Sequence, residues 1–349
     1  MRKKIVIFGG AFDPLHQAHI YIAKRAVQAI KAQKLYFVPT AKAFFKSPIK
    51  ASNQARLAML RVALKALPQM AVSNFDIKAQ NGFSFNTVQH FKQRFPNAEL
   101  YFLIGSDKLS ELAKWHNIEQ LQKLCRFVCY ERFGYPIDEQ LVQQFNVRLL
   151  GKCPLDLASS EMFGSHKFRQ IPAKVLHYIH QHNIYLKTIL QTLLDEPRMQ
   201  HCLRVGQLAK TLAVANKLDG KTAYTAGAYH DLAKQLPQAQ LEKLAKVAGV
   251  NDYPSWKVLH SYAGAYILKH WYGLNNSAVF SAIWNHTVPP QKMSQLDMII
   301  YLADKLEPMR VHEEWAKGID ITALVKLAKK DLKLAYQITL KYVRSLQKN

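Results

Sequence analysis

The sequence predicts a chain of two parts, a doubly wound parallel α/β sheet followed by an all-helical domain. In the first part, short apolar runs alternate with segments whose apolar residues recur at helical spacing, a pattern typical of parallel strands joined by helices. One apolar run, residues 5–8, leads directly into Gly9 and Gly10, as expected where a buried strand turns into a loop. From Leu186 onward the apolar residues follow helical spacing almost throughout, which predicts a second domain made of helices.

Each element of the first part is predicted by its own local pattern. Apolar runs predict the strands Lys4–Phe8, Leu35–Pro39, Met70–Phe75, Leu100–Ile104 and Arg126–Tyr130. Helical periodicity predicts the helices Ala18–Ala32, Asn53–Ala66, Asn86–Phe95, Leu109–Trp115 and Pro172–His182. Sheets of this kind bind ligands at the carboxyl ends of their strands, so the Gly-Gly turn after the first strand is a candidate site.

Length and composition set further bounds. The 349 residues are enough for two domains, and 48 Lys and Arg against 24 Asp and Glu give a net charge of +24. The lysines are scattered through helices, so we favour a plain solvated surface first, a surface that helps to attract anionic nucleotides second, and nucleic-acid binding least. No apolar run approaches the roughly 18 residues of a membrane helix. With no signal peptide and no metal or disulfide spacing among the cysteines, we expect a cytoplasmic protein that does not bind membranes.

Two histidines follow the Gly-Gly turn. His16 and His19 stand three residues apart at the start of the next predicted helix, so they share a face and can point at one spot. Helix N-termini attract phosphate through their free backbone amides. A nucleotide phosphate site and an incidental pair of histidines beside a common turn both fit this spacing, whereas the dinucleotide fingerprint and the Walker loop do not.

The stretch Gly9-Gly-Ala-Phe-Asp-Pro-Leu-His-Gln-Ala-His19 resembles the signature of the HxGH nucleotidyltransferases, and most closely that of the nicotinate mononucleotide adenylyltransferases. Ala18 replaces the family's second-to-last glycine. The resemblance implies a Rossmann-like fold and adenylyl transfer from ATP, accompanied by Mg²⁺, to nicotinate mononucleotide. It implies that the catalytic residues His16 and His19 hold phosphates in the transition state, and that the nucleotides contact Gly9, Gly10, Phe12 and Asp13.

Further segments extend this resemblance over about residues 3–186. Lys46, ahead of Arg56-x-x-Met59, matches a lysine that assists transfer. Ser84 stands where a threonine helps to bind the pyridine nucleotide. The remaining expected nucleotide contacts are Gly105, Asp107, Trp115, Ser159 and Ser160. For Trp115, core packing is the alternative. Gly164 occupies the position of an arginine that contacts ATP phosphates, and Lys167 or Arg169 could supply the missing charge.

The second part contains histidines and aspartates in the order H…HD…H…H…D. They are His201, His230, Asp231, His260, His286 and Asp304. Several lie within or beside apolar helical runs, where such groups need a partner. Imidazole and carboxylate together suit iron, manganese or zinc, so the set predicts a metal site. Any one of these residues alone would be an ordinary polar residue.

This order resembles the HD-domain metal phosphohydrolases, and its surroundings resemble the bacterial symmetrical diadenosine tetraphosphate hydrolases. The matching segments are Arg198…His201, Ala228–Lys234, Leu259-His260, His286-Thr287 and Ala303-Asp304…Glu307-Pro308…Arg310. The resemblance implies His201, His230, Asp231 and Asp304 as ligands of iron, with manganese or zinc as alternatives, and Asp231 as catalytic too. It also implies a substrate-binding set: Lys234, His260, His286, Thr287 and Arg310. His260 and His286 could instead hold a second metal.

We therefore expect a nucleotidyltransferase domain at residues 1–187 and an HD phosphohydrolase domain at residues 188–349. The first would make nicotinate adenine dinucleotide and pyrophosphate, and the second would cleave diadenosine tetraphosphate to two ADP with a metal-bound hydroxide. Two alternatives stay open: the HD half acts on another nucleotide, or it is a regulatory or RNA-binding module. A homo-oligomer is compatible with the sequence.

Overall fold

The computed structural model describes residues 2–41, 49–80 and 82–346. The chain divides into two compact units, Met1–Tyr185 and Leu186–Asn349, which we call the sheet unit and the helical unit. Lys46 lies outside the described residues.

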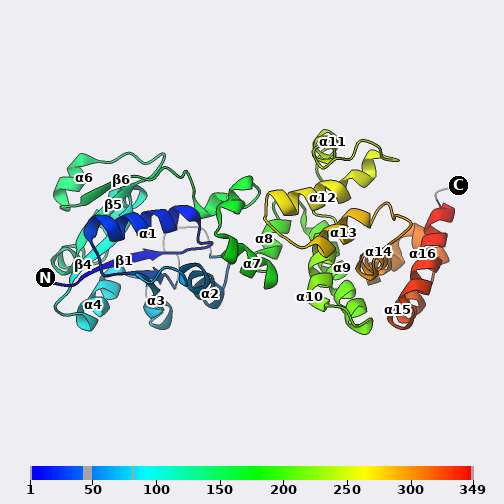
Figure 1. Cartoon of the computed structure of the whole chain (residues 1–349), viewed down its shortest axis with the longest axis horizontal. Coiled ribbons are helices and arrows are strands. Elements are labelled where there is room, and N and C mark those ends of the chain that lie inside the picture. Colours follow the sequence, from blue (N-terminus) through cyan, green and yellow to red (C-terminus); the bar gives the residue numbers. More distant parts are fainter. Residues whose placement is uncertain (1, 42–48, 81, 347–349) are drawn as a thin grey trace. The chain divides into compact units, whose positions relative to one another are not determined.

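Parallel strands form one sheet in the order β3-β2-β1-β4-β5-β6 (Figure 1). They are β1 (Lys4–Gly10), β2 (Lys34–Pro39), β3 (Met70–Val72), β4 (Glu99–Gly105), β5 (Arg126–Glu131) and β6 (Arg148–Lys152). In the central strand β1, Val6 is in register with Leu35 of β2 and with Tyr101 of β4. The strand order reverses between β1 and β4, which makes the ends of these two strands the switch point where ligands bind in such sheets.

Helices cover both faces of this sheet (Figure 1). They are α1 (Gln17–Ile30), α2 (Asn53–Leu64), α3 (Phe75–Lys78), α4 (Ser84–Arg94), α5 (Ile118–Leu124), α6 (Glu139–Gln144) and α7 (Ala173–Gln181). Ile5 and Ile7 belong to the same buried cluster as Val88 and Phe91 of α4. Because side chains alternate along a strand, Val6 faces the opposite side, which α1 covers. The doubly wound parallel sheet is confirmed.

In the sheet unit, one strand was not predicted and two predicted elements differ from the structure. β6 was missed because most of its residues are exposed and it forms no apolar run. The strand expected to reach Phe75 ends at Val72, since Phe75 begins α3. The helix expected at Leu109–Trp115 is instead a 3-10 segment, η1 (Ser106–Lys114). The Ser106 hydroxyl anchors its start by donating to the Tyr135 carbonyl, a distant contact that periodicity does not encode.

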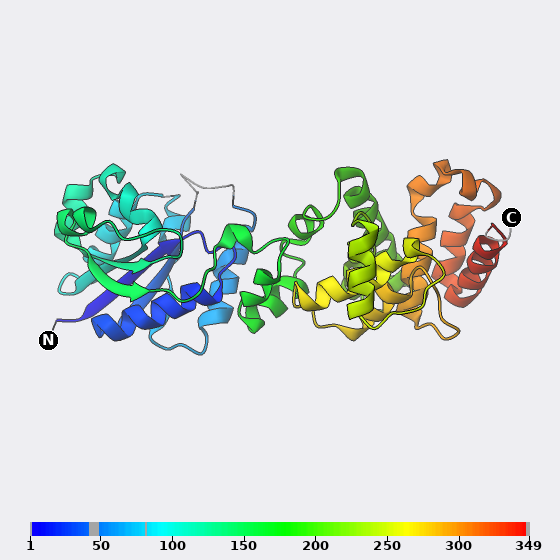
Figure 2. The same cartoon turned by 90° about the horizontal axis from the view of Figure 1, so that it is seen from above.

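The helical unit contains helices and 3-10 turns within the described residues (Figure 2). The helices are α8 (Leu186–Leu190), α9 (Glu196–Ala215), α10 (Gly220–Tyr229), α11 (Gln238–Val247), α12 (Leu259–His270), α13 (Ser277–Asn285), α14 (Gln295–Leu306), α15 (Ile321–Lys330) and α16 (Leu332–Leu346). Helices α9 and α10 cross closely, because a Cβ atom on Gly227 would lie 2.9 Å from the Cα of Gly206. Among the described helices, none has the length and apolar character that crossing a membrane requires.

Candidate active sites

The loop after β1 carries the first candidate site. A Cβ atom on Gly10 would lie 3.1 Å from the ring of Phe12, so glycine lets the loop close tightly here. Phe12 has a φ of 49° and is 2% exposed. Its ring packs against Phe37 and His19, with centroids 5.3 and 5.1 Å away. Phe12, expected to contact the nucleotide, therefore supports His19 from within the core.

His16 and His19 lie together at the start of α1. Their ring centroids are 3.7 Å apart, so the shared face expected from their spacing is present. The His16 backbone N–H donates to Nδ1 of His19 (3.2 Å), which leaves the proton of a neutral His19 on Nε2. Burial, and next the positive charge of Arg132, lower the pKa of His16 to about 3. His16 is thus neutral at pH 7, and within the described residues its buried Nδ1 has no hydrogen-bond partner.

Asp13 belongs to the frame of this loop. Its Oδ1 accepts from the Tyr185 hydroxyl (2.6 Å) and from the Ala51 N–H (3.1 Å), while Oδ2 accepts from the Lys50 N–H. Both carboxylate oxygens are thus engaged by the chain itself, and Asp13, which is expected to contact the nucleotide, also holds segment 50–51 beside the loop.

Arg56 is a second frame residue. It is fully buried and donates to the carbonyls of Ala11 and Thr40, each at 2.7 Å. It thereby ties the loop after β1 to the loop after β2. In the sequence, Arg56 lies among apolar residues of a predicted helix. The family resemblance included Arg56, but the sequence did not indicate this structural role.

The ends of β4 and β5 form the neighbouring part of the site. A Cβ atom on Gly105 would lie 2.5 Å from Oδ1 of Asp107 and 2.7 Å from Cδ of Arg132. Asp107 pairs with Arg132 at 2.9 Å, so the expected ribose acceptor already has a cationic partner. Trp115 packs edge-on against Phe102 and Phe127, with centroids 5.7 and 6.1 Å away. Its ring thus contributes to the core, the alternative considered for it.

The expected phosphate-binding segment near residue 160 is short. Ser159–Glu161 form a single 3-10 turn rather than the start of a helix. Ser159 donates to the Pro14 carbonyl at 3.0 Å, which brings this turn to the loop after β1, whereas Ser160 is exposed. Gly164 has a φ of +77°, a conformation that would strain an arginine. Ser84 begins α4 and is half-buried.

Lys167 was expected to be one possible substitute for the arginine missing at Gly164. It pairs with Glu161 at 2.8 Å and with Asp156 at 3.6 Å. Arg169, the other candidate, is exposed. The positive charge of Arg132 helps to lower the pKa of His16. Arg132 directly follows β5, at the strand end where ligands bind in such sheets, but it was not among the residues singled out in the sequence.

The helical unit brings four histidines together with their Nε2 atoms inward. Nδ1 of His230 contacts the Gly227 carbonyl (2.7 Å), that of His260 the Lys257 carbonyl (2.8 Å) and that of His286 the Ile283 carbonyl (2.6 Å). A carbonyl can only accept, so each Nδ1 carries a proton, and a ring in its neutral form offers the Nε2 lone pair toward the centre.

His201, on α9, also directs its Nε2 inward, but a carboxylate rather than a carbonyl holds its Nδ1. Its Nδ1 lies 3.2 Å from Oε1 of Glu307. Burial raises the pKa of Glu307, but hydrogen bonds from His201 and Arg204 outweigh burial and lower the pKa to about 2. Glu307 is therefore ionised and accepts the proton of Nδ1, which leaves Nε2 of His201 for the centre.

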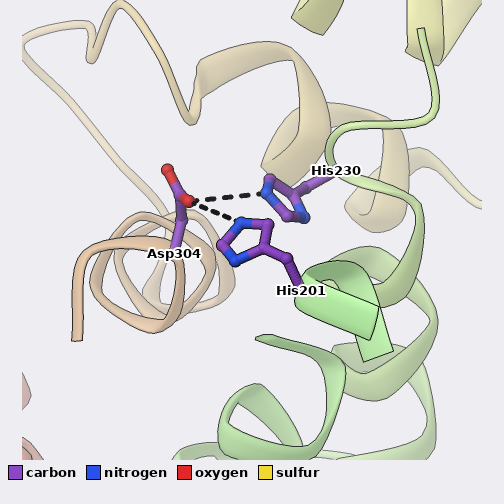
Figure 3. Close-up of side chains that lie close together, drawn as sticks. All are labelled: His201, His230 and Asp304. Atoms are coloured by element: carbon purple, nitrogen blue, oxygen red, sulfur yellow. Dashed lines mark ion pairs between the residues drawn. The ribbon is translucent and has the colours of Figure 1, made fainter. Parts of the chain in front are cut away.

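The inward nitrogens converge on two buried aspartates. Oδ1 of Asp304 lies 3.2 Å from Nε2 of His201 and 3.5 Å from Nε2 of His230 (Figure 3). Oδ1 of Asp231 lies 3.0 Å from Nε2 of His260 and 3.6 Å from Nε2 of His286.

These atoms form two groups, each with its ligand atoms within 4.8 Å of one another. The groups are His201, His230 and Asp304, and His230, Asp231 and His286. All of these residues are buried, and within the described residues Nε2 of His230 has no hydrogen-bond partner. A buried polar atom without a partner is costly, and nitrogen with carboxylate oxygen is a suitable donor set for a divalent transition metal. The residues therefore fit a metal.

Cationic side chains surround this centre. The Lys234 ammonium lies 3.4 Å from the ring nitrogens of His260, and burial lowers its pKa. Nη1 of Arg198 pairs with Oδ2 of Asp231 at 3.1 Å. Arg198, Arg204 and Arg310 line a cavity of about 240 Å³ with His201. Thr287 instead bonds to the Ser261 hydroxyl (2.9 Å), so the expected substrate contact is tied to the start of α12.

Comparison with known proteins agrees with both sites. A cytidylyltransferase-like family model matches residues 7–171, and an HD-domain model matches residues 198–309. A Mycoplasma genitalium protein named "Probable nicotinate-nucleotide adenylyltransferase/Ap4A hydrolase" is 58% identical over 100% of both chains. The chain belongs to this two-domain family. A "Probable nicotinate-nucleotide adenylyltransferase" of Aliarcobacter butzleri is 37% identical over 39% of this chain and 75% of its own length.

The comparison with solved structures also gives a similar protein. A "predicted HD superfamily hydrolase involved in NAD metabolism" from Clostridium acetobutylicum is 30% identical, covers 46% of this chain and 87% of its own, and has a TM-score of 0.41. The HD domain at residues 198–309 implies a site for a divalent metal. Glu307 and Arg204, which orient His201, were not predicted as site residues, although Glu307 belongs to the matched Glu-Pro segment.

Proposed function

We propose that this chain is an enzyme with two active sites. Residues 1–187 transfer AMP from ATP to nicotinate mononucleotide, giving nicotinate adenine dinucleotide and pyrophosphate. Residues 188–349 cleave diadenosine tetraphosphate symmetrically to two ADP. The first activity is supported chiefly by the full-length relative. For the second, the observation that carries the proposal is the convergence of four imidazole Nε2 atoms on two buried aspartates.

In the sheet unit, positioned donors do the chemistry without a covalent intermediate. The neutral His16 lies with His19 at the N-terminus of α1, where backbone amides also favour phosphate. Donors held in place before the reaction stabilise the charge that develops on the transferred phosphate. Mg²⁺ accompanies ATP, and Lys46 is proposed to assist. Arg132 adds positive charge next to His16.

In the helical unit, His201, His230, Asp231 and Asp304 are the proposed ligands of iron, with manganese or zinc as alternatives. A divalent metal bound there supplies a bound water of lowered pKa. The chain's own residues then fix the imidazoles through Nδ1, and Lys234 and Arg310 neutralise charge on the phosphates. A second metal beside the first is proposed on His260, His286 and Oδ1 of Asp231, because Nε2 of His230, common to both groups, has one lone pair and can bind only one metal.

The test uses the full chain. We expect equimolar or greater bound metal by elemental analysis, conversion of diadenosine tetraphosphate to ADP alone, and adenylylation of nicotinate mononucleotide in the same preparation. A chelator should abolish only the hydrolysis once Mg²⁺ is restored. Hydrolysis of another nucleotide in preference, or RNA binding without any hydrolysis, would replace the proposal for the helical unit. Because the proposed substrates are nucleotides, we also propose a cytoplasmic location. The homo-oligomer stays a prediction.

A further inference from the structure

Arg310 lies against the proposed metal ligands of the helical unit. Its Nη2 donates to Oδ1 of Asp304 (2.8 Å) and lies 3.4 Å from Nε2 of His201. Its Nε donates to the Asp304 carbonyl at 3.0 Å. An imidazole Nε2 has a single lone pair. A guanidinium N–H and a metal ion therefore compete for His201, and both draw on the same oxygen of Asp304.

The other end of the Arg310 guanidinium is held by Glu313. Nη1 donates to both oxygens of this carboxylate, at 2.7 and 2.9 Å. The indole N–H of Trp315 donates to Oε2 of Glu313 at 2.6 Å, and the Tyr342 hydroxyl donates to the Trp315 carbonyl at 2.6 Å. The Glu313 side chain is 43% exposed, so these contacts, rather than burial, fix its position.

We infer that Glu313, held by Trp315, is a positioning residue for Arg310. By competing for the same guanidinium, Glu313 weakens the hold of Arg310 on His201 and Asp304, and so favours metal binding. It also keeps Arg310 beside the site, where the freed N–H groups meet a substrate phosphate. This inference rests on the proposed phosphohydrolase function. Neither Glu313 nor Trp315 was among the residues singled out in the sequence.

Two carboxylates competing for one guanidinium explain why the arrangement has this effect. Hydrogen bonds between charged groups are stronger than those between neutral groups, and two of them join Arg310 to Glu313. Without Glu313, the guanidinium is left with Asp304 as its remaining carboxylate in this network, and a metal must displace it fully.

The test measures metal affinity, with Mn²⁺ as the probe, by competition with a chelating dye on metal-stripped full-length protein. Glu313→Gln should weaken Mn²⁺ binding about tenfold, the scale of one charged hydrogen bond, and Trp315→Phe should weaken it less. In the metal-saturated Glu313→Gln variant, the KM for diadenosine tetraphosphate should rise while kcat changes less. The matched control is Glu314→Gln, which removes the same charge from a side chain that is 85% exposed and paired with Lys317.

A double-mutant cycle separates positioning from general charge. In an Arg310→Met background, Glu313→Gln should leave Mn²⁺ affinity unchanged. An equal loss in that background, or an equal loss in Glu314→Gln, would overturn the inference. Unchanged Mn²⁺ affinity in both Glu313→Gln and Trp315→Phe would overturn it too. Circular dichroism checks each fold; if Glu313→Gln misfolds, Trp315→Phe decides. Failure of the wild-type protein to bind Mn²⁺ or hydrolyse any nucleotide would instead refute the proposed function.

Discussion

Nδ1 of His201 lies 3.2 Å from Oε1 of Glu307, and 106 residues separate the two in the chain. Arg204 donates to the same carboxylate, with its Nε 2.9 Å from Oε2. A carboxylate behind a metal-binding histidine fixes its ring and raises its basicity. This pair therefore prepares Nε2 of His201 for a metal.

Glu307→Gln should lower metal affinity by about 10–100-fold, the usual range for losing such a partner. The amide keeps the shape of the side chain but neither the charge nor the acceptor strength. Metal titration of the stripped protein is the measurement, with adenylyl transfer as the internal control. A metal affinity equal to that of the wild-type protein would show that Glu307 has only a structural role at the end of α14.

His19→Ala should reduce adenylyl transfer by about 10²–10³-fold, the scale for losing one preorganised donor. Binding of nicotinate mononucleotide should change little, because the lost group acts on phosphate. His182→Ala is a suitable control, since His182 is exposed and lies outside the proposed site. Turnover of His19→Ala at the wild-type rate would remove His19 from the mechanism.

Arg132→Ala should raise the KM for ATP by roughly tenfold, as expected for losing a charged contact with phosphate. Lys167→Ala should change it far less, because Lys167 is paired with two carboxylates, Glu161 and Asp156. Arg132 instead pairs with one, Asp107, and its charge also acts on His16. Steady-state kinetics of both variants at saturating nicotinate mononucleotide decide between them. The reverse result would assign the missing charge to the segment after Gly164.

Asp231→Ala should abolish hydrolysis of diadenosine tetraphosphate and lower the bound metal. Asp231 faces His230, His260 and His286, so no neighbour can replace its charge and its position together. Adenylyl transfer should stay within about threefold, since the two proposed sites have no residue in common and sites without shared partners act independently. If both activities collapse while circular dichroism shows an intact fold, the two sites are coupled.

Local pattern predicted the sheet unit well where strands are buried and poorly where they are exposed. β1 is an apolar run because both of its faces are covered, whereas β6 has little apolar character to reveal it. The same distinction explains the site residues. Asp13 matched a family motif, yet only the folded chain shows that its oxygens are taken by Lys50, Ala51 and Tyr185.

The sequence by itself predicted the parallel sheet, the helical domain and the residues proposed for both sites, and local geometry is enough to orient three of the histidines. His230, His260 and His286 each place Nδ1 on the carbonyl three residues earlier, a contact that depends only on local helical geometry. Only the tertiary structure shows which carboxylates contact Nδ1 of His201 and the guanidinium of Arg310. Glu307, Asp304 and Glu313 reach these side chains through the packing of α14 and the turns after it, because a contact between distant segments follows from packing rather than from periodicity.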